Sequence, residues 1–283
     1  MNQLKLLFIT VGLIVSGAVF SSGGDAPPLD RAPDLSNDKA ALQHGAKLFV
    51  NHCLNCHSAS GMRYNRLKDI GLTDEQIKNN LLFSADKIGE TMGVAMLPKD
   101  AKNWFGAMPP DLSVIARAKS SGQGTGADYI YTYLRSYYRD ASRPTGWNNV
   151  AYPNSAMPHV LWESQPARGL EKTELIHDAK QPASFEKIVT TYDTLGTAVV
   201  NKTKLSTHTD HAGVTYKYIT DDKNIKANQK FNEDVAHITA FMQYMADPSA
   251  STRKSMGVWV LLFLGIFILL AYFLNKEYWK DIK

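Results

Sequence analysis

The run Cys53-Leu54-Asn55-Cys56-His57 constrains this chain more than any other feature of its sequence. The C-x-x-C-H spacing is the signature of covalent c-type haem attachment. On a helix, this spacing places both thiols and the imidazole on one face, so that the thiols can bond the two vinyl groups of a porphyrin while the imidazole reaches the iron. The alternatives are a dithiol redox motif and half of a zinc site. Both are weaker, because the chain has only these two cysteines and no βαβ pattern surrounds them.

The first 21 residues are predicted to be a secretory signal peptide. Lys5 precedes an apolar run from Leu6 to Phe20, and small residues follow at 21–24. An uncleaved membrane anchor is the alternative interpretation. Export agrees with the haem motif, since covalent haem attachment takes place outside the bacterial cytoplasm.

The C-terminal region contains an uncharged apolar segment of 18 residues, Gly257–Leu274, which is long enough to span a membrane. Trp259 and Tyr272 lie near its ends, where aromatic rings favour the membrane interface. The alternative is a buried core helix, but an apolar helix at the end of a chain is rarely one. We therefore predict an exported domain over 22–252, a transmembrane helix over 253–275 and a cytoplasmic tail over 276–283.

The exported region is predicted to be mainly helical. Apolar residues recur at helical spacing in a segment that follows Ser36, in Ala127–Asp140 and in Asn232–Ala246. Ser36 is the expected N-cap of the first of these helices and Asn232 that of the third. Residues 180–231 differ, with Thr-Tyr, Val-Val and Tyr-Lys-Tyr runs that indicate a β-hairpin or an irregular insertion. The formal net charge of +4 leaves no basic excess of the kind that nucleic-acid binding requires, so no nucleic-acid partner is expected.

A methionine thioether or a second histidine is the usual sixth ligand of a c-type haem iron. Five methionines lie outside the signal, the membrane segment and the helical stripes, and Met62 is too close to His57 in the sequence to reach the opposite face of the haem. The remaining candidates are Met92, Met96, Met108 and Met157. Met108 and Met157 both lie in proline-containing loops, and the residues alone do not separate them. Among the histidines, His159 is the nearest rival, and the others are expected on surface or helix faces.

Several motifs, in order along the chain, resemble the cytochrome c1 family, the haem-bearing subunits of ubiquinol–cytochrome c reductase (cytochrome bc1) complexes. The most specific are the run Met108-Pro-Pro-Asp-Leu-Ser113 and the arrangement of a helix, Pro248 and an apolar span at the C-terminus. Other matching pieces are Arg63-Tyr64 after the haem motif, Ala156-Met157-Pro158, and Asp234-Val235 in the last helix before the span. The resemblance covers residues 36–165 and 232–275, whereas 166–231 match poorly.

The resemblance implies a class I cytochrome c-like fold around one covalent haem c, with loop or β insertions and a single transmembrane helix. It implies that Met157 is the sixth ligand opposite His57, and that Arg117 neighbours a haem propionate. It further implies that Pro110 packs on the haem edge and that Tyr129 is an aromatic residue of the haem pocket.

The function that the resemblance implies is electron transfer from a Rieske iron–sulfur protein to a soluble cytochrome c, beside a cytochrome b subunit. The haem domain would lie in the periplasm and the anchor in the bacterial inner membrane. No catalytic site is expected in this chain, because quinol oxidation would belong to another subunit. The alternatives are a membrane-anchored cytochrome c that serves a terminal oxidase, and a haem sensor or peroxidase with an open sixth position.

Overall fold

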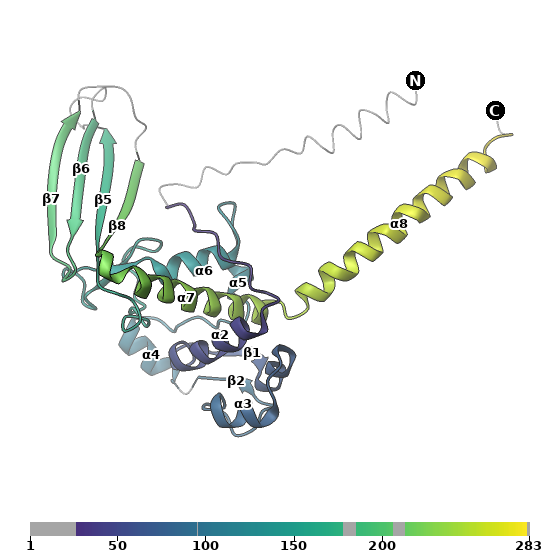
Figure 1. Cartoon of the computed structure of the whole chain (residues 1–283), viewed down its shortest axis with the longest axis horizontal. Coiled ribbons are helices and arrows are strands. Elements are labelled where there is room, and N and C mark those ends of the chain that lie inside the picture. Colours follow the sequence, from purple (N-terminus) through teal and green to yellow (C-terminus); the bar gives the residue numbers. More distant parts are fainter. Residues whose placement is uncertain (1–26, 95, 178–184, 206–212, 282–283) are drawn as a thin grey trace.

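The computed structural model describes residues 27–94, 96–177, 185–205 and 213–281. These residues form three structural parts. Figure 1 shows a helical body, an antiparallel sheet that projects from it, and a long C-terminal helix that extends away from the body. The predicted signal peptide, residues 1–21, lies outside the described residues.

The centre of the helical body is the packing of helix α2 (Lys39–His52) against helix α7 (Ile225–Ala246). Gly45 makes this contact close, because a Cβ atom added there would overlap the backbone carbonyl of His237. The rings of Phe49 and Phe241 pack together farther along, with centroids 5.4 Å apart, and both side chains are fully buried. Two helices that are far apart in the sequence are therefore held in fixed register.

The boundaries of the three predicted helices differ from the sequence-based expectation. Helix α2 is capped by Asp38, whose carboxylate accepts a hydrogen bond from the amide of Ala41, and not by Ser36. Helix α7 begins seven residues before Asn232, so Asn232 lies inside the helix and does not cap it. The side-chain oxygen of Asn232 accepts a hydrogen bond from the guanidinium of Arg135. Helix α6 (Gly126–Arg135) ends early, because the chain enters a short strand at Tyr137.

The remaining short elements surround this helix pair. They are β1 (Ala59–Arg63), η1 (Tyr64–Ile70), α3 (Asp74–Asn80), β2 (Thr91–Met92), α4 (Pro98–Phe105), α5 (Ile115–Ala118), β3 (Tyr137–Arg139), β4 (Trp147–Asn149) and η2 (Asp222–Asn224). Strand β1 pairs with β2 and strand β3 with β4, each antiparallel. Long loops between these elements, rather than helices, border much of the central cavity described below.

A four-stranded sheet stands where a β-hairpin or an irregular insertion was predicted, and the prediction of a mainly helical chain is not confirmed. The strands of this sheet are β5 (Arg168–His177), β6 (Phe185–Tyr192), β7 (Ala198–Leu205) and β8 (Gly213–Thr220), in the order β7-β6-β5-β8, all antiparallel. Strand accounts for 20% of the structure and helix for 43%, so the protein combines helix and sheet. The Thr-, Val- and Tyr-rich runs in this region favour strands, and the pairing of β5 with β8 extends the expected hairpin to four strands.

A buried arginine attaches the sheet to the helical body. The guanidinium of Arg168, at the start of β5, donates to the backbone carbonyls of Arg135 and Tyr137 and lies 3.9 Å from the ring centroid of Tyr218. Burial lowers the pKa of this arginine to about 10, still well above neutral pH. The charge is therefore retained and is balanced by carbonyl oxygens and an aromatic face.

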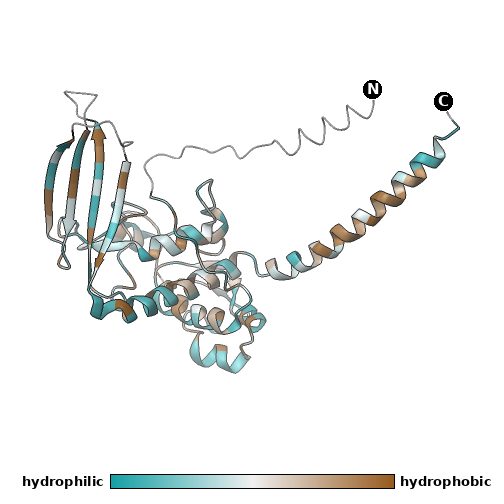
Figure 2. Ribbon diagram, turned by 45° about the horizontal axis from the view of Figure 1, so that its top comes forward, coloured by the Kyte–Doolittle hydropathy of each residue, from teal (hydrophilic) through white to brown (hydrophobic). Residues whose placement is uncertain are grey.

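The C-terminal helix α8 (Ala250–Tyr278) contains the predicted membrane span. It is the one helix among the described residues that is long and apolar enough to cross a membrane. An 18-residue window within it has a mean hydropathy of 2.6, and none of its residues is buried in the protein. Figure 2 shows the hydrophobic colouring running along most of its length. An apolar surface of this size would be costly in water, whereas a lipid bilayer would cover it favourably.

Truncation of the chain after Asp247 is expected to release a soluble fragment that still carries the haem predicted from the C-x-x-C-H motif. No core residue lies in α8, and the truncation removes an exposed ion pair between Arg253 and Asp247, which contributes little to stability. Fractionation of cells followed by haem staining of a denaturing gel provides the measurement. Loss of haem or of folding in the fragment would show that α8 belongs to the core.

Candidate functional site

The C-x-x-C-H motif lies in a hydrogen-bonded turn that follows α2 directly, and not within a regular helix. Cys53 is the C-cap residue of α2, and its carbonyl accepts hydrogen bonds from the amides of Cys56 (3.1 Å) and His57 (2.9 Å). These bonds preserve one helical turn, so the juxtaposition expected from the spacing is kept. Both thiols are free, that of Cys53 buried and that of Cys56 partly exposed. Burial raises the pKa of Cys53 to about 12, so this thiol is protonated at neutral pH.

A hydrogen bond fixes the orientation of the His57 imidazole. Its Nδ1 donates to the backbone carbonyl of Pro110 over 2.7 Å, because a carbonyl can only accept. The Nε2 atom then carries the lone pair and is available as a metal ligand. Burial lowers the pKa of His57, which keeps the ring neutral at physiological pH. Pro110, predicted at the haem edge, thus acts on His57 through its backbone.

An apolar cavity of about 350 Å³ adjoins the motif. Cys53, Cys56 and His57 line it together with the loop around Met108 and the loop around Met157. Further lining side chains come from helices α5, α6 and α7: Ile115, Tyr129, Ile130, Tyr133, Leu134 and Met242. Its volume and lining are those of a pocket for an extended apolar group.

Hydroxyl groups hold the loop that carries Met157. Tyr137 donates to the Met157 carbonyl over 2.9 Å, and the Tyr137 and Ser155 hydroxyls both lie 2.8 Å from the hydroxyl of Tyr133. Burial is the main cause of the raised pKa values of both tyrosines, so both hydroxyls are protonated and able to donate. The loop is therefore attached to helix α6 and strand β3 at a defined position.

Both methionines that the sequence leaves open line the cavity, but their surroundings differ. Met108 is 40% exposed, whereas Met157 is partly buried and packs against the main core. His159 does not line the cavity: it is buried with its ring stacked on Tyr137, and burial lowers its pKa to about 3. Met92 is fully buried in β2, outside the cavity lining.

Of the other predicted pocket residues, Tyr129 lines the cavity and Arg117 does not. Tyr129 lines the cavity and its ring stacks on Tyr133, with centroids 6.0 Å apart. Arg117 is exposed on α5 and is not among the lining residues, so its role at a propionate stays a prediction. Lys119, which the sequence reasoning missed, lines the cavity with its ammonium nitrogen 5.1 Å from the ring centroid of Tyr129. Met242, expected only in a core stripe, both packs in the core and lines the cavity.

Asp111 ties the loop of Pro110 to the residues that follow His57. Its carboxylate accepts hydrogen bonds from the Ser58 hydroxyl (2.8 Å), the Ser60 hydroxyl (2.6 Å) and amide (2.8 Å), and the Ser113 amide (2.8 Å). Partial burial favours the neutral acid, but the hydrogen bonds from Ser113 and Ser60 outweigh it and hold the pKa of Asp111 well below its usual value.

Replacement of Asp111 by Asn is expected to lower stability in a pH-dependent way. Because the folded pKa is depressed, the carboxylate stabilises the fold above pH ~4 and this contribution is lost as the pH falls below that value. At neutral pH we expect the free energy of unfolding to fall by about 1 kcal/mol, a figure that already allows for the solvent exposure of Asp111. This corresponds to a fall of ~2–4 °C in Tm. Thermal unfolding followed by circular dichroism at pH 7 and pH 3.5 measures it. If the Tm difference between wild type and variant were the same at pH 7 and at pH 3.5, the stabilising role of the Asp111 carboxylate would be contradicted.

Two free thiols, a neutral imidazole and a thioether around one apolar cavity are the donor set of a c-type cytochrome. The sequence pattern of the Cytochrome C1 family matches residues 32–282. The chain therefore belongs to the cytochrome c1 family.

Of three similar proteins, two carry cytochrome c1 names and the third carries a different name. The chain is 37% identical to the cytochrome c1 of Allochromatium vinosum, over 98% of this chain and 99% of the relative. It is 38% identical to a protein of Nitrosomonas europaea named ammonia monooxygenase gamma subunit, over 97% of each chain. It is 23% identical to the cytochrome b/c1 of Bradyrhizobium diazoefficiens, over 96% of this chain and 40% of that longer protein.

Family membership fixes the general character of the protein. It is an electron-transport protein of a respiratory chain, it carries one covalent haem c, and it is anchored in a membrane by an apolar helix.

Proposed function

We propose that Cys53 and Cys56 would hold the haem through two thioether bonds and that the Nε2 atom of His57 would bind its iron. The proposal is supported by the two free thiols and by the hydrogen bond from Nδ1 to Pro110, which leaves Nε2 available. When bound, the haem supplies one-electron redox chemistry at its iron. The protein supplies the covalent attachment, one fixed imidazole and an apolar surrounding.

Met157 is the proposed second protein ligand of the haem iron. It lines the cavity and is partly buried, and its carbonyl is held by Tyr137, so its loop position is fixed. Met108 also lines the cavity, but it is 40% exposed and lies in a loop without a comparable hydroxyl anchor among the described contacts. The resemblance to the family favours Met157 independently of these contacts.

Lys119 at the cavity and the nearby Arg117 are the proposed partners of the haem propionates. Lys119 lines the cavity, and Arg117 lies two residues earlier on α5. A cation beside a carboxylate offsets its charge and lowers the cost of placing it near an apolar cavity. Tyr129 and Pro110 contribute apolar surface that keeps water away from the site.

For the whole protein, we propose electron transfer within a quinol–cytochrome c reductase complex. The chain would accept an electron from a Rieske iron–sulfur protein and pass it to a soluble cytochrome c, with the haem domain in the periplasm. The observation that carries this proposal is the match to the cytochrome c1 family over nearly the whole chain, together with the apolar helix α8. A relative named cytochrome b/c1 supports cytochrome b as the neighbouring subunit.

Purification of the native complex tests this function. An affinity tag placed on this chain, with membranes solubilised in mild detergent, is expected to recover a di-haem cytochrome b and an iron–sulfur protein together with it. Recovery with a terminal oxidase and without cytochrome b would favour a membrane-anchored cytochrome c that serves that oxidase. Carbon monoxide binding by the reduced wild-type protein would favour an open sixth position, and hence the sensor or peroxidase.

A further inference from the structure

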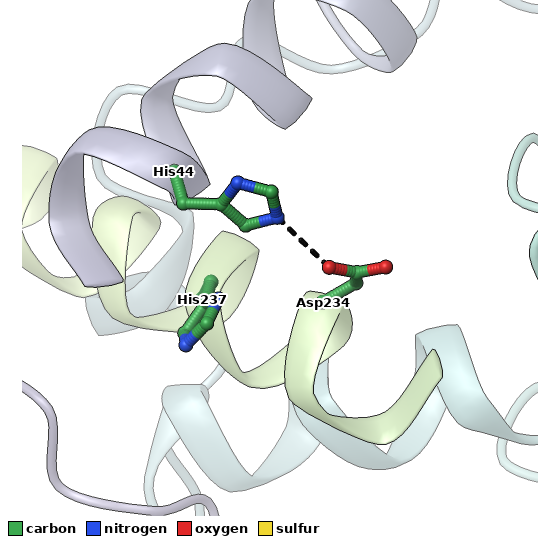
Figure 3. Close-up of side chains that lie close together, drawn as sticks. All are labelled: His44, Asp234 and His237. Carbon is green, nitrogen blue, oxygen red and sulfur yellow. Dashed lines mark hydrogen bonds and ion pairs between the residues drawn. The ribbon is translucent and has the colours of Figure 1, made fainter. Parts of the chain in front are cut away.

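A second group of potential metal ligands lies between α2 and α7, apart from the proposed haem site. It consists of His44 on α2 and of Asp234 and His237 on α7 (Figure 3). One ligand atom from each residue lies within 4.8 Å of the other two. His44 precedes Cys53 by nine residues, which is about 13 Å along the helix axis. The haem cavity lining contains none of the three.

Close packing of α2 on α7 fixes the backbone that carries these three residues. Asp234 and His237 are three residues apart on α7, so their side chains leave the helix on the same face. Gly45, next to His44, contacts the backbone carbonyl of His237 so closely that any Cβ atom would overlap it. The three ligands are thus carried by two rigid helices whose separation is set beside the site, as a preorganised metal site requires.

One side chain of this group has a buried polar atom that makes no hydrogen bond within the described part of the protein. The Nε2 of His44 lies 2.8 Å from Oδ1 of Asp234, while the rings of His44 and His237 meet edge to face with centroids 5.2 Å apart. The Nδ1 of His237 is buried and has no hydrogen-bond partner among the described residues. A buried polar atom of this kind is uncommon in a native protein, and a metal ion bound to this nitrogen would satisfy it.

We propose that His44, Asp234 and His237 bind a zinc ion. Two imidazole nitrogens and one carboxylate oxygen form a three-ligand set that Zn²⁺ accepts, with water as the fourth ligand. Lys230 binds the other carboxylate oxygen, Oδ2, at 3.2 Å and leaves Oδ1 for the metal. The ion replaces the hydrogen bond between His44 and Asp234, whose atoms separate from 2.8 Å to about 3.4 Å, the edge of a tetrahedron with bonds of ~2.1 Å.

The consequence of zinc binding is a cross-link between α2 and α7. These helices carry the haem motif at the end of α2 and the cavity residue Met242 on α7. A metal that binds the folded protein and not the unfolded chain raises the thermal midpoint in proportion to the logarithm of its concentration above Kd. Zinc therefore stabilises the helix pair behind the haem without contact with the haem itself.

Equilibrium dialysis of the purified full-length holoprotein against Zn²⁺ tests the proposal, with a purification tag that contains no histidine. The iron of the covalent haem counts the chains, so zinc and iron are measured together by atomic emission. We expect one zinc per iron, and at least a tenfold weaker Kd in each of the variants His44→Gln, Asp234→Asn and His237→Gln. In parallel, Zn²⁺ is expected to raise the Tm of the wild type and not of His44→Gln.

The control is the double variant His208→Gln, His211→Gln, since these two histidines are close in the sequence and lie outside the described residues. It is expected to keep the full affinity. Zinc binding that persists in His44→Gln and His237→Gln, or that disappears in the control, overturns the proposal. The Soret absorption of each variant reports its folding, and Asp234→Asn provides a second test should a histidine variant fail to retain haem.

Discussion

Replacement of Met157 by leucine is expected to leave the haem covalently attached but to remove one axial ligand. A thioether ligand stabilises ferrous over ferric iron, so its loss lowers the reduction potential, by ~0.1 V or more within the ~0.8 V that axial ligands span. Leucine keeps the volume and apolarity of methionine, so the packing cost should stay below about 1.5 kcal/mol. Optical spectroscopy should show loss of the methionine–iron charge-transfer band, and the reduced variant should bind carbon monoxide.

The matched control for this experiment is Met108→Leu. Met108 lines the same cavity but is 40% exposed, so its replacement should leave the spectrum and the potential nearly unchanged. A Met157→Leu protein with a lowered potential should also be a poor acceptor for a high-potential iron–sulfur donor, and turnover of the complex should stall. If Met108→Leu loses the band and Met157→Leu keeps it, the ligand assignment is wrong.

Replacement of both Cys53 and Cys56 by serine is expected to abolish covalent haem attachment. Thioether bonds survive denaturation, so the wild-type chain should retain haem through a denaturing gel, whereas the double variant should show none. Each single variant, Cys53→Ser or Cys56→Ser, keeps one thiol and serves as the intermediate case, with at most one link and little assembled protein. Haem staining normalised to the amount of chain provides the measurement.

Haem retention by the double serine variant at the wild-type level would contradict the attachment proposal. Serine is nearly isosteric with cysteine, and the Cys53 thiol is neutral in the structure, so the exchange removes a reactive sulfur without removing a charge. Loss of the haem in this variant therefore reports the missing bonds rather than an electrostatic change.

The parts of the site that are local in sequence were predictable from the sequence. The spacing of Cys53, Cys56 and His57 indicates covalent haem, and the structure places these residues on one cavity together with Met157. The span over 253–275 falls inside α8, because eighteen uncharged apolar residues leave little choice of environment. The choice between Met108 and Met157 is not local, and it rests on the resemblance to the family.

Features that depend on distant pairing could not be read from the sequence. The strand runs in 180–231 suggest a hairpin, but the pairing of β5 with β8 joins segments separated by a whole hairpin. His44 and His237 are expected on helix faces, which is where they lie, yet only the packing of α2 on α7 brings them together. Likewise, the role of the Pro110 carbonyl at His57 depends on a contact across 53 residues.

The most direct test of the proposed electron path is the redox state of this haem during quinol oxidation by the purified complex. In stopped-flow mixing with quinol and no acceptor, the haem c absorption should become reduced, and addition of oxidised soluble cytochrome c should reoxidise it within one turnover. The same mixing with the Met157→Leu complex should leave this haem largely oxidised. A haem that stays oxidised in the wild-type complex while soluble cytochrome c becomes reduced would contradict the account, because the electrons would then bypass this chain.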